Sequence, residues 1–193
     1  MSTFSHITLE GRDEPLTLAW PATGNAAAFL HFDRADAWRA FIAGLGIDRR
    51  IPEIIQRKFV RAQTLYLLGW IDFSLNKAGE LAALIALERA EMDRHGGELL
   101  KRKRGFAARL KHMVTADGLT GRDIPTVERC GGTAIGQLAG DVHPTLAERR
   151  NTLAYDDPFD GLPTGSLLEL VRDLINYAYR DCIAEAASLG APT

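Results

Sequence analysis

The chain is poor in cysteine, and its net charge is close to zero. Only Cys130 and Cys182 occur among its 193 residues, and they lie far apart. Two distant thiols exclude a disulfide framework and a cysteine-based metal site, and they favour a reducing cytosol. A net charge of −2 argues against a surface that coats nucleic acid, so an anionic partner must meet a local patch. We therefore expect a cytoplasmic protein without disulfides.

A long uninterrupted apolar run is also missing. Residues 15–32 carry no formal charge, but Pro15, Pro21, Gly24 and Asn25 interrupt them, which excludes a membrane-spanning helix there. Charged residues between positions 10 and 14 arrive too early for the apolar segment of a secretory signal. We expect no membrane association.

Several catalytic and ligand-binding motifs are absent. There is no Gly-x-Ser-x-Gly nucleophile elbow, and residues 130–133 (Cys-Gly-Gly-Thr) lack the Gly-Lys-Ser/Thr end of a phosphate loop. The paired acids Asp156–Asp157 and Glu88/Glu91 have no accompanying histidine at ligand spacing, and His6 and His31 stand alone. We expect neither a metal nor a cofactor.

The apolar residues that are present predict helices. Hydrophobic residues make up 46% of the chain and charged residues 25%, as in a soluble globular protein. Apolar positions recur every three or four residues from 57 to 94 and from 167 to 189. Residues 72–74 either bend the first segment or divide it in two. Its second half is apolar over more than half of its circumference, as in a central bundle helix.

We therefore predict an all-α, up-and-down helical bundle in residues 33–193. Residues 1–32 form an N-terminal extension in which residues 4–20 alternate weakly around a turn at 11–15, predicting a small β-hairpin. The glycine-rich residues 117–145 predict a connector or short helices. The last helix, 167–189, carries two apolar stripes, which predicts a homodimer formed through this C-terminal helix.

Residues 146–155, Leu-Ala-Glu-Arg-Arg-Asn-Thr-Leu-Ala-Tyr, combine more chemistry than any other ten residues. On a helix Arg150 points in the same direction as Leu146 and Leu153, so its charge needs a partner or a shared cleft. Tyr155 lies about 140° around the helix from Arg150. The plain alternative is a capped helix with a solvated Arg149 and a core Tyr155.

Residues 150–155 (Arg-Asn-Thr-Leu-Ala-Tyr) resemble the Arg-Asn-x-x-Ala-His motif of the HEPN superfamily, small all-α proteins of bacterial conflict and stress systems. The resemblance implies a HEPN-like bundle over roughly residues 50–190. In members that are metal-independent ribonucleases, it implies that Arg150 binds the scissile phosphate, Asn151 is its polar neighbour, and Tyr155 stands where the proton-transferring histidine would be.

The change from histidine to Tyr155 decides which function we expect. Tyrosine ordinarily titrates near pH 10 and histidine near 6.5, so a tyrosine base at neutral pH needs a pKa shift of roughly 3 units. Loss of general acid–base catalysis slows a reaction by about 10²- to 10⁴-fold. His112 or His143 could replace the missing group in space. The expected protein is therefore a HEPN-like module with a degenerate nuclease site.

Three functions stay open. The first is a noncatalytic HEPN-like protein of a stress or defence system that binds RNA or a protein partner such as an antitoxin. The second is a metal-independent ribonuclease toxin that uses Arg150 and Tyr155. The third is a structural interaction protein in which Arg150 pairs with Asp156, Asp157 or Asp173. The predicted nucleic-acid contacts comprise Arg149, Lys101, Arg102, Lys103 and Arg104.

Overall fold

Apolar side chains at helical spacing form nine α-helices in the described part of the chain, and one short hairpin precedes them. The computed structural model describes residues 4–25, 27–95, 97, 105–155 and 166–189. The elements in order are β1 (Leu16–Ala19), β2 (Phe29–Phe32), α1 (Ala35–Gly44), α2 (Glu53–Leu68), α3 (Leu75–His95), α4 (Phe106–Thr115), the 3-10 helix η2 (Gly121–Asp123), α5 (Pro125–Cys130), α6 (Ala134–Ala139), α7 (Leu146–Tyr155), α8 (Leu167–Ala178) and α9 (Arg180–Leu189). Within these residues, no helix is both long and apolar enough to cross a bilayer.

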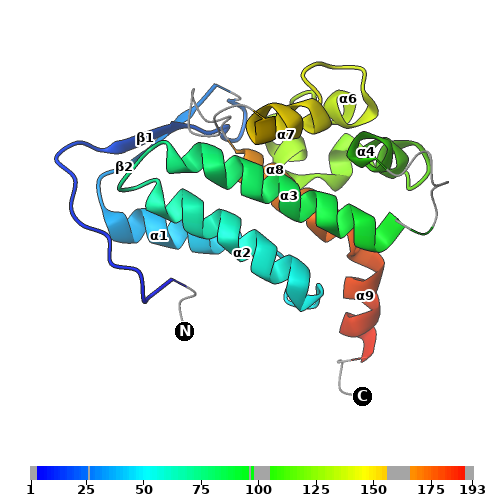
Figure 1. Cartoon of the computed structure of the whole chain (residues 1–193), viewed down its shortest axis with the longest axis horizontal. Coiled ribbons are helices and arrows are strands. Elements are labelled where there is room, and N and C mark those ends of the chain that lie inside the picture. The colour runs from blue at the N-terminus through cyan, green and yellow to red at the C-terminus, as the bar shows by residue number, and fades with distance from the viewer. Residues whose placement is uncertain (1–3, 26, 96, 98–104, 156–165, 190–193) are drawn as a thin grey trace.

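Helix α3 is the centre of the fold. It packs against α2 along one side and against α8, α7 and α4 on the others, and Figure 1 shows it running through the length of the body. Its buried residues include Ala83, Leu84, Leu87 and Ala90, so α3 is packed on several sides, as its broad apolar surface predicted. The chain is mainly helical, as expected, and residues 72–74 separate α2 from α3.

The crossing of α2 and α3 is close because it uses a glycine. A Cβ atom on Gly79 would lie 2.6 Å from Cδ2 of Tyr66, and the Tyr66 side chain is buried. The ring therefore occupies the space that a larger residue at position 79 would need.

A small N-terminal hairpin is present, but the predicted strand pairing was wrong. β1 pairs antiparallel with β2, with Leu16 opposite Phe32, so residues 4–9 supply neither strand. Those residues instead contain a turn, in which the Ile7 amide donates to the Phe4 carbonyl at 3.2 Å. The Arg39 guanidinium donates to the Ile7 carbonyl at 2.7 Å. A side chain thus satisfies backbone groups that a strand partner would otherwise bind.

The hairpin is tied to the helical body by Trp20. Leu16 and Leu18 are buried while their neighbours are exposed, and Trp20 follows them into the core. The Trp20 indole donates from Nε1 to Glu169 Oε2 on α8 at 3.0 Å. The hairpin therefore shares one core with the helices, and α8 anchors it.

The prediction of one continuous helix over 167–189 was also wrong. The helix is interrupted at Tyr179, whose φ and ψ are −104° and 12°. α9 then continues in a new direction away from the body (Figure 1). The Tyr179 ring is buried and its hydroxyl donates to Asp93 Oδ2 at 2.7 Å. Because this anchor holds the end of α8, the apolar positions of residues 167–189 are divided between two helices.

We predict that Gly79→Ala destabilises the fold, although alanine is the better helix former by about 1 kcal/mol. The added methyl group must displace the buried Tyr66 ring, which costs about 1–3 kcal/mol. Urea unfolding measures the change. Gly44→Ala is the matched control, because a Cβ atom added at Gly44 would meet no neighbouring atom within 4 Å; equal effects at both sites would contradict the close crossing.

Candidate functional site

Helix α7 begins at a reciprocal cap built from its own first residues. The Thr145 amide donates to Glu148 Oε2 at 2.8 Å, and the Glu148 amide donates to Thr145 Oγ1 at 3.1 Å. His143 also bonds to this carboxylate at 2.8 Å. The Thr145 amide, and then His143, lower the pKa of Glu148. This cap fixes where α7 starts and therefore which face Arg150 presents.

Arg150 lies against α3, where it is held by Glu88. Its Nε and Nη2 donate to Glu88 Oε2 at 3.0 and 2.8 Å, and Nη1 donates to Asn151 Oδ1 at 3.3 Å. The side chain is 27% exposed. The predicted inward direction of Arg150 is therefore observed, but its carboxylate partner is Glu88. Pairing with Asp173 was wrong because that carboxylate accepts from Thr126 and Arg172, while Asp156 and Asp157 lie outside the described residues.

A second arginine approaches the same carboxylate. Arg109 on α4 places Nη2 3.7 Å from Glu88 Oε1, and its side chain is almost fully buried. Glu88 therefore lies between guanidinium groups from α4 and α7. The three side chains join three helices, and their formal charges sum to +1.

Asn151 and Tyr155 lie on the solvent side of α7. Asn151 is exposed but touches Arg150 through its amide oxygen. Tyr155 is 84% exposed, so the alternative of a core tyrosine was wrong. The structure brings Arg150 and Asn151 together and leaves Tyr155 on another face, as the helical angle predicted.

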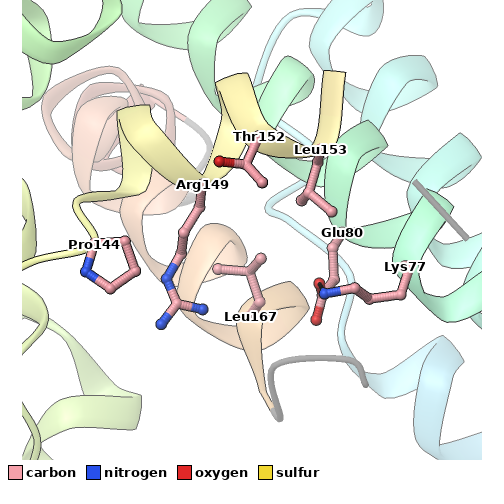
Figure 2. A pocket seen from close by; sticks show the side chains of 7 residues that line it. All are labelled: Lys77, Glu80, Pro144, Arg149, Thr152, Leu153 and Leu167. Atoms are coloured by element: carbon pink, nitrogen blue, oxygen red, sulfur yellow. Dashed lines mark ion pairs between the residues drawn. The ribbon is translucent and has the colours of Figure 1, made fainter. Parts of the chain in front are cut away.

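Arg149 points into a cavity instead of lying fully in solvent. Figure 2 shows its guanidinium across the cavity from Lys77 and Glu80, with Leu167 between them. The cavity measures about 230 Å³, and Pro144, Thr152 and Leu153 complete its wall. The Lys77 ammonium lies 3.3 Å from Glu80 Oε2, whose side chain is only 1% exposed. Arg149 also borders a second cavity beside Gly131 and Gly132.

A buried acid and a histidine lie farther along α3, beside a histidine of α4. Glu91 is 0% exposed, and among the described residues neither of its carboxylate oxygens accepts a hydrogen bond. Burial raises its pKa to about 8, with nearby Arg109 opposing this change. His95 Nε2 lies 3.7 Å from Glu91 Oε2, and its ring meets that of His112 edge-on at 5.2 Å. These imidazoles lie at the carboxyl end of α3.

The two histidines considered as substitutes for the motif histidine have other contacts. His112 lies beside His95, and His143 bonds to Glu148 at the start of α7, whereas Tyr155 is the last residue of α7. The predicted contacts Lys101, Arg102, Lys103 and Arg104 lie outside the described residues. In the part of the chain that is described, no three His, Cys, Asp or Glu side chains are arranged to hold a metal ion.

Sequence reasoning missed Glu88, Lys77 and Glu80 as members of the site. The signal was present, because Glu80 and Glu91 lie on the same helical stripe as the apolar residues of α3. A buried acid on such a stripe requires a cationic partner or must keep its proton. Lys77 lies three residues before Glu80 on α3. The partners of Glu88 could not be predicted from the sequence, since Arg109 and Arg150 reach α3 from helices far along the chain.

We predict that Glu91 lowers stability as pH rises. Its folded pKa of about 8 exceeds the ordinary value of 4.5, so the folded state retains a proton that the unfolded state releases between these values. Its stabilising contribution is complete below pH 4.5 and is lost as pH approaches 8, a change of roughly 3 kcal/mol by pH 7.

Urea unfolding at pH 5 and pH 8 tests this effect. Glu91→Gln cannot ionise and is expected to lose less stability over this interval than the wild type. Glu53→Gln, on the exposed surface of α2, is the control and is expected to follow the wild type. Equal pH dependence in Glu91→Gln and wild type would contradict the assignment.

The comparisons with known proteins assign no family to the chain. No protein-family model, curated protein or solved structure matches the chain. The described geometry consists of a helix with one guanidinium held by α3, a second lining a cavity, and a solvent-facing asparagine and tyrosine. These contacts supply the physical basis for a functional proposal.

Proposed function

We propose that the chain is a HEPN-like helical protein of a bacterial stress or defence system that binds RNA through α7 and has a degenerate nuclease site. The observation that carries this proposal is the position of Arg150, which is anchored by Glu88 yet remains 27% exposed beside Asn151. An immobilised, partly exposed guanidinium binds phosphate with less loss of side-chain entropy than a free one.

Single-stranded RNA fits this surface better than a duplex. Tyr155 offers an exposed aromatic ring five positions along α7 from Arg150, on another face of the helix. Unpaired bases stack on such rings, and a flexible single strand can turn a base toward it. Asn151 supplies an amide for polar contacts. An acidic protein partner such as an antitoxin would use the arginines but would not require base stacking, so the aromatic ring favours RNA.

The geometry supports binding more than catalysis. Arg150 faces α3 and Tyr155 faces solvent, so one chain does not bring a phosphate-binding group and a proton-transferring group together. The ribonuclease alternative therefore requires another group to act at the bound phosphate. The structural alternative accounts for the Arg150–Glu88 ion pair but gives no role to the exposed Asn151 and Tyr155.

RNA binding by Arg150 is tested with a labelled 20-nucleotide single strand, using fluorescence anisotropy at two salt concentrations. Arg150→Ala is expected to weaken binding about tenfold, as for a lost charge-assisted hydrogen bond, and to reduce the salt dependence by about one phosphate contact. Tyr155→Ala is expected to weaken binding by roughly 5- to 100-fold through lost stacking.

Arg57→Ala is the matched control, because Arg57 is an exposed arginine that pairs with Glu53 on α2. Wild-type affinity in Arg150→Ala, with only a lower melting temperature, would support the structural alternative and contradict RNA binding. The ribonuclease alternative is tested by incubating the RNA with the protein in EDTA. RNA cleavage by the wild type that is lost in Arg150→Ala would establish a metal-independent ribonuclease.

The proposal includes a homodimer formed through the C-terminal helix. α9 extends away from the body (Figure 1) and contains no buried residue among those whose side chains are described. Cys182 and Ile183 are only half-buried, and a second copy would cover them. Light scattering at micromolar concentration is expected to give twice the chain mass, and Ile183→Glu is expected to reduce it; a wild-type monomer would contradict this partner assignment.

A further inference from the structure

Glu88 determines how much positive charge the α7 surface presents. Its Oε2 accepts from Arg150 at 2.8 and 3.0 Å, while its Oε1 lies 3.7 Å from Arg109. One carboxylate therefore lies between two guanidinium groups. Removal of this negative charge would raise the net charge of the three side chains from +1 to +2 without removing either arginine.

The contacts of Arg150 leave part of its guanidinium accessible. Glu88 takes hydrogen bonds from Nε and Nη2, and Asn151 takes one from Nη1. A guanidinium has five N–H donors, so these contacts leave donors for a visiting oxyanion on a side chain that is 27% exposed. A bound phosphate would therefore lie close to both Arg150 and the Glu88 carboxylate.

The charge of Glu88 bears on which kind of phosphate Arg150 would bind. A phosphodiester carries one negative charge, which a cluster of charge +1 balances, whereas a terminal phosphomonoester carries nearly two at neutral pH. Its second charge would be repelled by Glu88. Glu91 also approaches Arg109, but burial raises the pKa of Glu91 to about 8, so at pH 7 it contributes little negative charge.

We propose that Glu88 is a specificity-determining residue, which adapts the α7 surface to the monoanionic phosphodiesters within an RNA strand and disfavours dianionic phosphomonoesters. The inference rests on the proposed RNA binding and adds a substrate class to it. Glu88 acts here through its charge and its contact with Arg150.

The experiment uses dimethyl phosphate and methyl phosphate as competitors against labelled RNA at pH 7.5. The first is a monoanion, and the second is mainly a dianion. Glu88→Gln preserves the shape of the side chain and an acceptor for Arg150. It is expected to improve inhibition by methyl phosphate, relative to dimethyl phosphate, by about tenfold. Glu53→Gln is the same substitution at a remote exposed site and is expected to leave the ratio unchanged.

A second measurement needs no variant of Glu88. At pH 5.5 methyl phosphate is largely a monoanion, so the wild type is expected to lose its preference for dimethyl phosphate. Three results would overturn the inference. The ratio of the inhibition constants could be unchanged in folded Glu88→Gln, the wild type could keep its preference for dimethyl phosphate at pH 5.5, or neither phosphate could displace RNA. If Arg150→Ala loses RNA binding, the proposed function is still supported. If RNA binding does not depend on Arg150, both the proposed function and the role of Glu88 are contradicted.

Discussion

Acidic side chains within the packed surface of α3 are the constraint on which the rest of the structure depends. An ionised carboxylate is strongly disfavoured away from water unless a cation or hydrogen-bond donor accompanies it. Glu80 meets this need through Lys77 on the same helix, and Glu88 through Arg109 and Arg150 from α4 and α7. Packing of α4 and α7 is thus coupled to charge neutralisation. Glu91 meets the constraint differently, because its raised pKa keeps it mainly protonated at neutral pH.

This coupling links stability to the candidate site. Arg150 is at once a partner that α3 needs and the group that would contact phosphate, so structural and binding roles meet in one side chain. Arg149 has a different position, since it borders two cavities and lies across one of them from the Lys77–Glu80 pair. Adjacent arginines on α7 therefore face different environments, as the 100° rotation between successive helical residues requires.

Helix positions were largely predictable, and long-range pairings were not. Apolar spacing identified α2, α3 and α7. The strands were misplaced because the weak alternation of residues 4–9 carries no information about Arg39, which binds the Ile7 carbonyl. The break between α8 and α9 was missed because it depends on the bond from Tyr179 to Asp93, 86 residues away. Likewise, helical direction predicted that Arg150 turns inward but did not identify Glu88.

The bond between Trp20 and Glu169 has a consequence for synthesis on the ribosome. The two residues are 149 positions apart, so the indole of the N-terminal hairpin is made long before its acceptor. Chains emerge from the N-terminus at about 5–20 residues per second, which leaves the hairpin without α8 for many seconds. During that interval Trp20 can pack only against residues already made, such as Phe41 and Tyr66, and the native core closes only after α8 has left the exit tunnel.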